Sequence, residues 1–285
     1  MTATTPPLTT QETARHLPWG RWAVQSAAWT YVTVMLLIPL AVIFQDGLRD
    51  GLGALWQSIS LPIAWSALRL TLWTSALMAA INAVMGTLTA YVLVRYHFPG
   101  KGLLNAIVDL PLAIPTLVTG VMLVVLYGPQ SFIGAWLKGQ LNWQIIFAPP
   151  GIILALLFVN FPFVVRAVQP VLQGLDRESE EAAATLGAPS ATIFWRVTLP
   201  ALWLSIASGA LLSFARAIGE FGAIVIVAGN IPLRSQTAAV YVFGEVESAN
   251  RQGASAMSIV MLSLAFSLVL LVDWLRKRGQ KDTTE

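Results

Sequence analysis

The stretch Glu181–Pro200, EAAATLGAPSATIFWRVTLP, is a polar interruption in a chain otherwise dominated by apolar spans. Asp176 is a candidate N-cap for a helix here, and the acidic residues that follow it suit the positive end of the helix dipole. Gly187 stands where a left-handed C-terminal cap is expected. Pro189 would start a second short helix, and Pro200 would stand at the beginning of the next span. The stretch therefore predicts a helix, a sharp turn and a helix, with an alanine face that another protein can approach closely.

The composition indicates a polytopic membrane protein. Of the 285 residues, 56% are hydrophobic and 11% are charged, whereas a soluble domain carries roughly 25% charged residues. The net charge of +3 is too small and too scattered to indicate nucleic-acid binding. Cysteine is absent, and the two histidines, His16 and His97, have no nucleophile or carboxylate cluster beside them in the sequence. We therefore expect no catalytic residue, no metal site and no enzymatic activity in this chain.

Apolar runs divide the chain into six predicted spans, each near the ~20 residues that a bilayer requires. They lie at about 23–44, 67–94, 104–127, 150–168, 201–228 and 254–275. The predicted organisation is a tail (1–21), a first anchor with an outer loop (22–66), a core (67–275) that contains a cytoplasmic loop (171–200), and a second tail (276–285). The predicted fold class is all-α.

Lys and Arg residues outside the spans are distributed unequally. One set of flanks carries eleven of them and the other set carries four. The eleven are Arg15, Arg21, Arg95, Lys101, Arg166, Arg177, Arg196, Arg276, Lys277, Arg278 and Lys281. Because cytoplasmic flanks are enriched in Lys and Arg, we predict that both termini and the Glu181–Pro200 loop are cytoplasmic. The segments 127–148 and 230–253 would then lie outside, where a delivery protein can bind.

The third span contains helix-breaking residues. Pro111 and Pro115 fall inside it, followed by Thr116 and Thr119. Prolines free backbone carbonyls, which need partners from protein or from a water-filled cavity. One interpretation is a kinked packing helix. The other is a wall of a permeation path, in which freed polar groups or a half-helix N-terminus face an anion.

The fifth span contains two intramembrane charges, Arg216 and Glu220. Their spacing of four residues places them on one helix face, where they can pair. Ionisable groups at this depth cost several kcal/mol unless they are paired or hydrated. Either the two groups only pair, or Arg216 adds positive potential to an anion path while Glu220 holds it in place. Gly219 and Gly222 would allow a neighbouring helix to approach.

The spacing Glu181-Ala182-Ala183, Gly187, then Val197-x-Leu199-Pro200 resembles the EAA loop of ABC-type importer permeases. In that family the loop is the coupling helix that docks into a groove on the cytoplasmic ATPase. The resemblance implies a type I importer permease (MetI-like) fold of six transmembrane helices. It assigns Glu181, Ala182, Ala183, Gly187, Leu199 and Pro200 to ATPase coupling.

Two further stretches, DLPLAIPTLVTG (Asp109–Gly120) and FARAIGEFGAIVIVAGN (Phe214–Asn230), look like those of sulfate and molybdate permeases. FVVRAVQPVL (Phe163–Leu172) and GNIPLR (Gly229–Arg234) look most like the T-type permease of sulfate/thiosulfate importers. The resemblance implies a subunit of the bacterial inner membrane that conducts sulfate or thiosulfate. Its partners would be membrane lipid, a second W-type permease, two copies of an ATPase and a periplasmic sulfate-binding protein.

Two alternatives stay open at this point. A molybdate or tungstate permease shares the fifth-span signature. An ion-coupled secondary anion transporter would need its own coupling-ion site, and the sequence offers only Asp109 and Glu220 for one. The chain has no G-x-x-x-x-G-K-[ST] motif, since Gly100-Lys101-Gly102 lacks the upstream glycine and the hydroxyl. We therefore expect no cofactor on this chain, with ATP and Mg²⁺ used by the partner ATPase.

Overall fold

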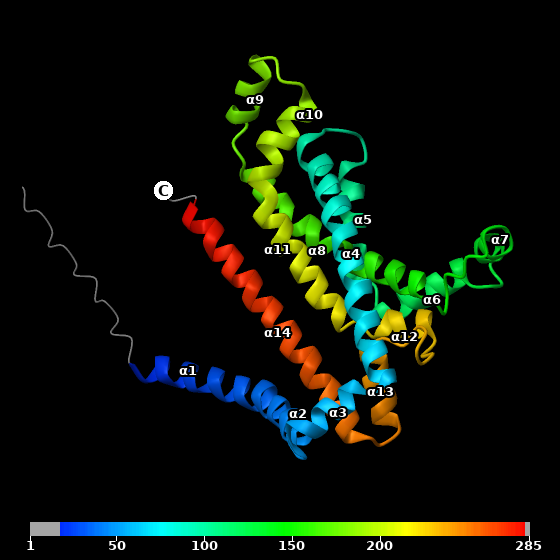
Figure 1. The fold of residues 1–285 in the computed structure, drawn as a ribbon. Coiled ribbons are helices and arrows are strands. Elements are labelled where there is room, and N and C mark those ends of the chain that lie inside the picture. The colour runs from blue at the N-terminus through cyan, green and yellow to red at the C-terminus, as the bar shows by residue number, and fades with distance from the viewer. Residues whose placement is uncertain (1–17, 283–285) are drawn as a thin grey trace, which may run out of the picture. The chain divides into compact units, whose positions relative to one another are not determined.

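The structure is a computed structural model that describes residues 18–282, and these residues form helices and no strand (Figure 1). The chain divides into two compact units, Met1–Gln45 and Asp46–Glu285. Most of the predicted N-terminal tail and the last three residues of the predicted C-terminal tail lie outside the described residues, so their predicted cytoplasmic location stays a prediction.

The first unit is one helical rod. It consists of α1 (Pro18–Val32), a π-helical turn η1 (Thr33–Leu37) and most of α2 (Ile38–Leu48). The apolar stretch Trp22–Leu48 is long enough to cross a membrane. Its large apolar side chains are mostly exposed, as expected for a helix that lipid or another subunit covers.

The second unit contains the other helices. They are α3 (Gly51–Ser60), α4 (Pro62–Arg95), α5 (Lys101–Ala113), α6 (Thr116–Tyr127), α7 (Phe132–Leu141), α8 (Pro149–Gly174), α9 (Glu178–Thr185), α10 (Ser190–Ile193), η2 (Phe194–Thr198, π-helical), α11 (Leu199–Ile218), α12 (Gly222–Ala228), α13 (Ala238–Glu247) and α14 (Arg251–Asp282). Within this unit α9, α10 and the turn between α4 and α5 lie at one end, and α3 and α13 lie at the other (Figure 1).

Among the described residues, five helical stretches are long and apolar enough to span a membrane. They are Trp22–Leu48, Pro62–Arg95, Pro149–Gly174, Ser190–Ile218 and Arg251–Leu275. They correspond to the predicted first, second, fourth, fifth and sixth spans. The predicted third span is a bent pair of helices, so the count reaches six when that pair is one span.

The predicted third span is not one continuous helix. It consists of α5 and α6, whose axes differ by 108° across a short break. Proline has no N–H to donate and restricts the residue before it to extended backbone. Ile114, which precedes Pro115, accordingly has φ −83° and ψ 127°, whereas Pro111 is accommodated inside α5. The predicted helix break at the prolines is therefore present, and it is a complete break at Pro115 with a new half-helix after it, whereas a merely kinked helix is not formed.

The predicted fifth span, 201–228, was wrong at both ends. The helix already begins at Ser190 and runs without interruption to Ile218. The π-helical turn η2 precedes Pro200, and a wider turn of this kind accommodates a residue that cannot donate a hydrogen bond. The second short helix that we predicted is therefore the first turn of this span. After Ile218 the chain breaks and restarts as the short helix α12.

The apolar patch 237–243 is too short to cross a membrane, and the sequence predicts a surface helix or a re-entrant piece there. In the structure this patch lies in α13, whose first turn is buried and not on the surface, since Ala238 and Val240 are both fully buried. The Ala238 N–H donates to the Thr71 hydroxyl of α4 at 2.8 Å. Burial and the neighbouring Glu245 raise the pKa of Tyr241 to about 12. Helix α13 is therefore anchored on α4.

Helix α8 lies at the centre of the second unit, packed against α4, α5 and α11. Its residues Val164, Val165 and Val168 are fully buried. The small-residue spacing Gly86-x-x-x-Ala90 of α4 faces α8, since a Cβ added at Gly86 would lie 2.8 Å from the Cβ of Val164. The sequence predicts close helix packing at this spacing, and the contact with Val164 confirms it.

We expect Gly86→Ala to lower the free energy of unfolding by about 1 kcal/mol, because the added methyl overpacks the contact with Val164. Thermal unfolding of the purified protein in detergent measures the effect. The matched control is Gly53→Ala in α3, where an added Cβ meets no atom within 4 Å. Equal melting temperatures for the two variants would contradict the packing argument.

Candidate coupling and translocation sites

The helix α9 ends in the left-handed cap that the sequence predicts. Gly187 has φ +84°. The N–H of Gly187 donates to the Ala184 carbonyl at 2.9 Å, and the N–H of Ala188 donates to the Ala183 carbonyl at 3.1 Å. These bonds satisfy carbonyls that the end of a helix leaves free. Asp176 does not occupy the N-cap position, which falls on Arg177, although its carboxylate accepts the Glu178 N–H at 3.1 Å.

The predicted coupling residues fall into two groups. Glu181, Ala182 and Gly187 are exposed and Ala183 is half-buried, all on α9 or its cap. Leu186, beside the cap, is 89% exposed. The second group, Leu199 and Pro200, lies at the start of α11. The exposed face of α9 is therefore free to bind a partner, whereas Leu199 and Pro200 belong to the helix behind it.

Arg216 and Glu220 pair as predicted, with Arg216 Nη1 2.7 Å from Glu220 Oε2. They do not share one helix face, however, because α11 ends at Ile218 and Glu220 lies in the break before α12. Glu220 is 2% exposed and its second oxygen accepts the Ala223 N–H at 3.2 Å. The side chain of Arg216 is 39% exposed. The carboxylate is thus fixed at the start of α12, and the guanidinium remains partly accessible.

The breaks in the third and fifth spans meet. A Cβ added at Gly222 would collide with the Thr116 hydroxyl and lie 3.1 Å from the Leu117 nitrogen. The first turn of α6 is therefore packed against the first turn of α12, two residues after Glu220. The close approach predicted for Gly222 is confirmed, whereas a Cβ at Gly219 would meet only the Arg216 carbonyl, at 3.9 Å. Helix α6 has no side-chain N-cap hydrogen bond, so its N-terminus keeps a partial positive charge beside Gly222.

The remaining path candidates lie elsewhere. A groove of about 1190 Å³ runs between α4, α5, α6 and α8, and its lining is mostly apolar. Pro111 and Thr119 line it together with Asn82, and the buried Thr119 hydroxyl has no hydrogen-bond partner. Pro115 is exposed at the break itself. The structure thus places Thr116 against Gly222, two residues after the Glu220 that pairs with Arg216. It places Pro111 and Thr119 in an apolar groove that suits a hydrated anion poorly.

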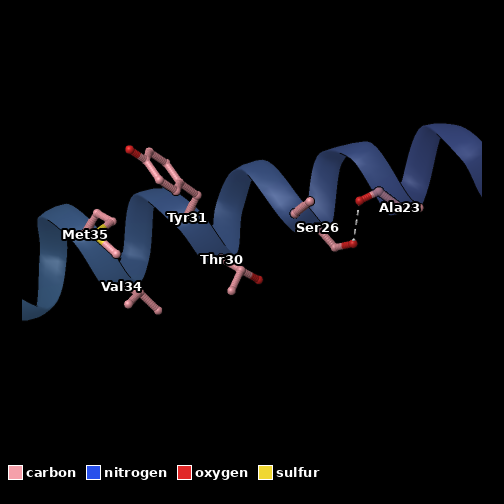
Figure 2. A pocket seen from close by; sticks show the side chains of 7 residues that line it. Ala23, Ser26, Thr30, Tyr31, Val34 and Met35 are labelled. Atoms are coloured by element: carbon pink, nitrogen blue, oxygen red, sulfur yellow. Dashed lines mark hydrogen bonds between the residues drawn. The ribbon is translucent and has the colours of Figure 1, made fainter.

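A shallower hollow of about 590 Å³ lies beside α1 in the first unit (Figure 2). All the residues that line it come from a single helical stretch, Ala23 to Met35, and the Ser26 hydroxyl already donates to the Ala23 carbonyl at 3.1 Å. One helix face cannot surround a ligand, so we assign no site to it.

Two hydrogen-bonded ion pairs between distant segments of the described residues were not predicted from the sequence. Arg95 pairs with Glu180 at 2.8 Å, and Arg166 pairs with Asp109 at 2.5 Å. The members of these pairs are 85 and 57 residues apart. Their charges were visible in the sequence, but no local spacing linked them. Within residues 18–282 no group of three or more His, Asp or Glu side chains is placed to hold a metal ion.

All five N–H donors of Arg166 on α8 are hydrogen-bonded, and four of them reach α5. Two go to the Asp109 carboxylate, one to the Asn105 side chain, one to the Asn105 carbonyl and one to Gln169. A lysine cannot reproduce this planar fork. We expect Arg166→Lys to lower the free energy of unfolding by about 1–2 kcal/mol, measured by thermal unfolding. Arg251→Lys is the control, because the Arg251 side chain is 85% exposed and its Nε lies 4.0 Å from the Asp46 carboxylate. An equal loss of unfolding free energy in this control would contradict the argument.

Comparison with known proteins decides the family. The family described as "Binding-protein-dependent transport system inner membrane component" matches residues 82–281. The chain belongs to this family. It is 42% identical over 251 residues, 88% of each chain, to the "Probable sulfate transport system permease protein cysT" of Nephroselmis olivacea. It is 39% identical over 264 residues, 91% of this chain and 92% of the relative, to the "Sulfate transport system permease protein CysT" of Synechocystis sp..

Solved structures share the fold of this binding-protein-dependent transport component. A bacterial ABC transporter involved in the import of the acidic polysaccharide alginate has a chain that matches with a TM-score of 0.75 at 17% identity, covering 91% of this chain and 96% of that one. The same transporter fold in complex with an alginate-bound periplasmic protein matches equally well, with 94% of that chain covered. The predicted ABC importer permease fold is confirmed, and the chain is a multi-pass membrane protein.

Proposed function

We propose that this chain is the T-type permease subunit of an ATP-driven importer that carries sulfate and thiosulfate across the bacterial inner membrane. The observation that carries the proposal is its 42% identity, over 88% of the chain, to a relative named as a sulfate transport permease. The partly exposed Arg216 at the meeting point of two broken spans supports an anionic substrate. The chain itself binds no cofactor, and the partner ATPase uses ATP and Mg²⁺.

The anion path runs past the breaks in the third and fifth spans. Arg216 and the N-terminus of α6 provide positive potential, and discontinuous helices place such termini where anions are held within membranes. Glu220, fixed by the Ala223 N–H, keeps the guanidinium in place. An anion in transit competes with Glu220 for Arg216, so its binding is weak enough to permit release.

The path is completed by a second, W-type permease. On α6, Val121 is 44% exposed and Val125 is 72% exposed. They leave an apolar surface for another membrane helix or for lipid. A periplasmic sulfate-binding protein delivers the anion to the outer segments. Two ATPase copies bind the cytoplasmic face, one of them at the exposed side of α9, with both termini of this chain on that same side of the membrane.

Uptake of radiolabelled sulfate by a bacterium that lacks its own sulfate importer tests the proposal, with this chain and its partners co-expressed. We expect uptake that thiosulfate blocks, molybdate does not, and Glu181→Ala abolishes. Rescue of molybdate-dependent growth without sulfate uptake would assign the substrate to the molybdate and tungstate class. Uptake that survives both Glu181→Ala and ATP depletion would indicate an ion-coupled secondary transporter and overturn the proposal.

A further inference from the structure

Glu180 of α9 contacts two spans through one carboxylate oxygen. Arg95, the last residue of α4, donates from Nη2 to Glu180 Oε1 at 2.8 Å. The hydroxyl of Thr198, at the end of η2, donates to the same oxygen at 2.9 Å. Helix α9 is therefore joined at a single point to the end of α4 and to the beginning of α11.

This contact is shielded from solvent. The side chains of Arg95 and Glu180 are 9% and 16% exposed, and Thr198 is 1% exposed. On one side Tyr91 of α4 and Phe194 of η2 pack edge to face, with ring centroids 5.2 Å apart. Water and salt screen a buried ion pair weakly, and removing one partner leaves an uncompensated charge. The contact is therefore stiff, unlike an exposed surface pair.

Glu180 and its neighbour Glu181 face in different directions. Successive residues on an α-helix are separated by about a quarter turn or slightly more, so the two carboxylates diverge. Glu180 lies against Arg95, whereas Glu181 is exposed. The outward carboxylate is available to a docked protein, and the inward one holds the helix to the spans.

The span that contains Thr198 leads directly to the candidate anion path. The helix from Ser190 to Ile218 is continuous, and Arg216 lies near its far end. A shift of α9 that is passed to Thr198 therefore moves the whole helix, because a packed helix responds as a rigid element. Through Arg95 the same shift reaches α4.

We propose that the contact among Glu180, Arg95 and Thr198 is the positioning link that passes movement of α9 to α4 and α11. This inference rests on the proposed function, in which α9 docks onto the ATPase. The three residues touch neither the anion nor ATP. They act by holding the docking helix and the two spans as one mechanical unit.

The assembled transporter in proteoliposomes tests the link by the number of sulfate ions imported per ATP hydrolysed. We expect Glu180→Gln to lower this ratio about tenfold, within the usual range of coupling between sites, while the ATPase stays bound in co-purification. Glu178→Gln, an exposed glutamate in the same helix turn, is the matched control and should leave the ratio unchanged. An unchanged ratio in Glu180→Gln, or loss of the bound ATPase, would overturn the proposal.

A double-mutant cycle separates the link from two independent effects. If Glu180 and Arg95 act through each other, Glu180→Gln combined with Arg95→Gln should be no worse than either change alone. If the fold-losses of the two single variants in sulfate imported per ATP multiply in the double variant, the two residues act separately and the link is overturned.

A distance measurement gives a readout that needs no substrate. Because the chain has no native cysteine, Ser179→Cys on α9 and His97→Cys just after α4, both at exposed positions, can carry paired spin labels in the assembled complex. We expect one narrow distance distribution that Glu180→Gln broadens, and an unchanged distribution would overturn the link. Broadening in a complex that imports no sulfate would instead leave the link intact and contradict the proposed substrate.

Discussion

Arg216→Ala is expected to lower sulfate uptake about a hundredfold, the effect of losing one charge-assisted interaction of about 2.7 kcal/mol. Arg216 is the partly exposed cation at the point where the two broken spans meet. Arg216→Lys retains the positive charge but not the planar fork, so it should retain part of the flux. Radiolabelled uptake with matched amounts of each variant in the membrane measures both effects.

The pairing role of Arg216 must be separated from its transport role. In Arg216→Ala the buried Glu220 carboxylate loses its partner, which destabilises the protein by about 3 kcal/mol. The double variant with Arg216→Ala and Glu220→Gln removes that unpaired charge and should restore the amount of folded protein. We expect uptake to stay low in the double variant. Recovery of uptake would show that Arg216 serves only to neutralise Glu220, and would remove it from the anion path.

Gly187→Val is expected to weaken ATPase binding about tenfold or more, with Gly187→Ala less severe. At φ +84° any side chain costs about 1–2 kcal/mol, and a β-branched one costs more. A Cβ at Gly187 meets no atom within 4 Å, so the effect comes from backbone strain and not from a clash. Because 1.4 kcal/mol corresponds to a tenfold change in affinity, co-purification of the ATPase with the permease should reveal the difference.

Gly100 provides a matched control for this prediction. It has φ +86° and equally open surroundings, but it is the N-cap of α5 and not part of α9 or its cap. Gly100→Val should carry a similar backbone strain and leave ATPase binding unchanged. Equal losses of ATPase binding in Gly100→Val and Gly187→Val would trace the defect to general instability. Full ATPase binding in both variants would contradict a docking role for the α9 cap.

Part of the candidate site could be predicted from the sequence because it depends on local geometry. The left-handed conformation of Gly187 follows from the end of a short helix, whose cap only glycine adopts without strain. The pairing of Arg216 with Glu220 follows from a four-residue spacing, which brings the two groups within reach even though the helix ends between them. The coupling role of Glu181 stays a prediction, since its exposure permits a partner without identifying one.

The long apolar runs by themselves predicted an all-helical membrane protein and placed a span in each of the five continuous helical stretches, although the ends of the fifth were misplaced. In lipid, a run of about 20 apolar residues must satisfy its own backbone hydrogen bonds, which a helix does, so this conclusion needs no tertiary information. The bend of the third span could not be predicted in this way. A proline shows where a helix can break, but neighbouring helices decide whether it kinks or turns by 108°.

Only the tertiary structure decided which distant residues meet. Thr116 lies against Gly222, and Glu180 rather than Glu181 lies against Arg95. Periodicity along a helix relates residues within a few turns, whereas these pairs are brought together by how α4, α6, α11 and α12 pack around α8. Packing depends on the shapes of many side chains at once, which is why the contact between α9 and two spans emerged from the fold and not from the spacing of residues.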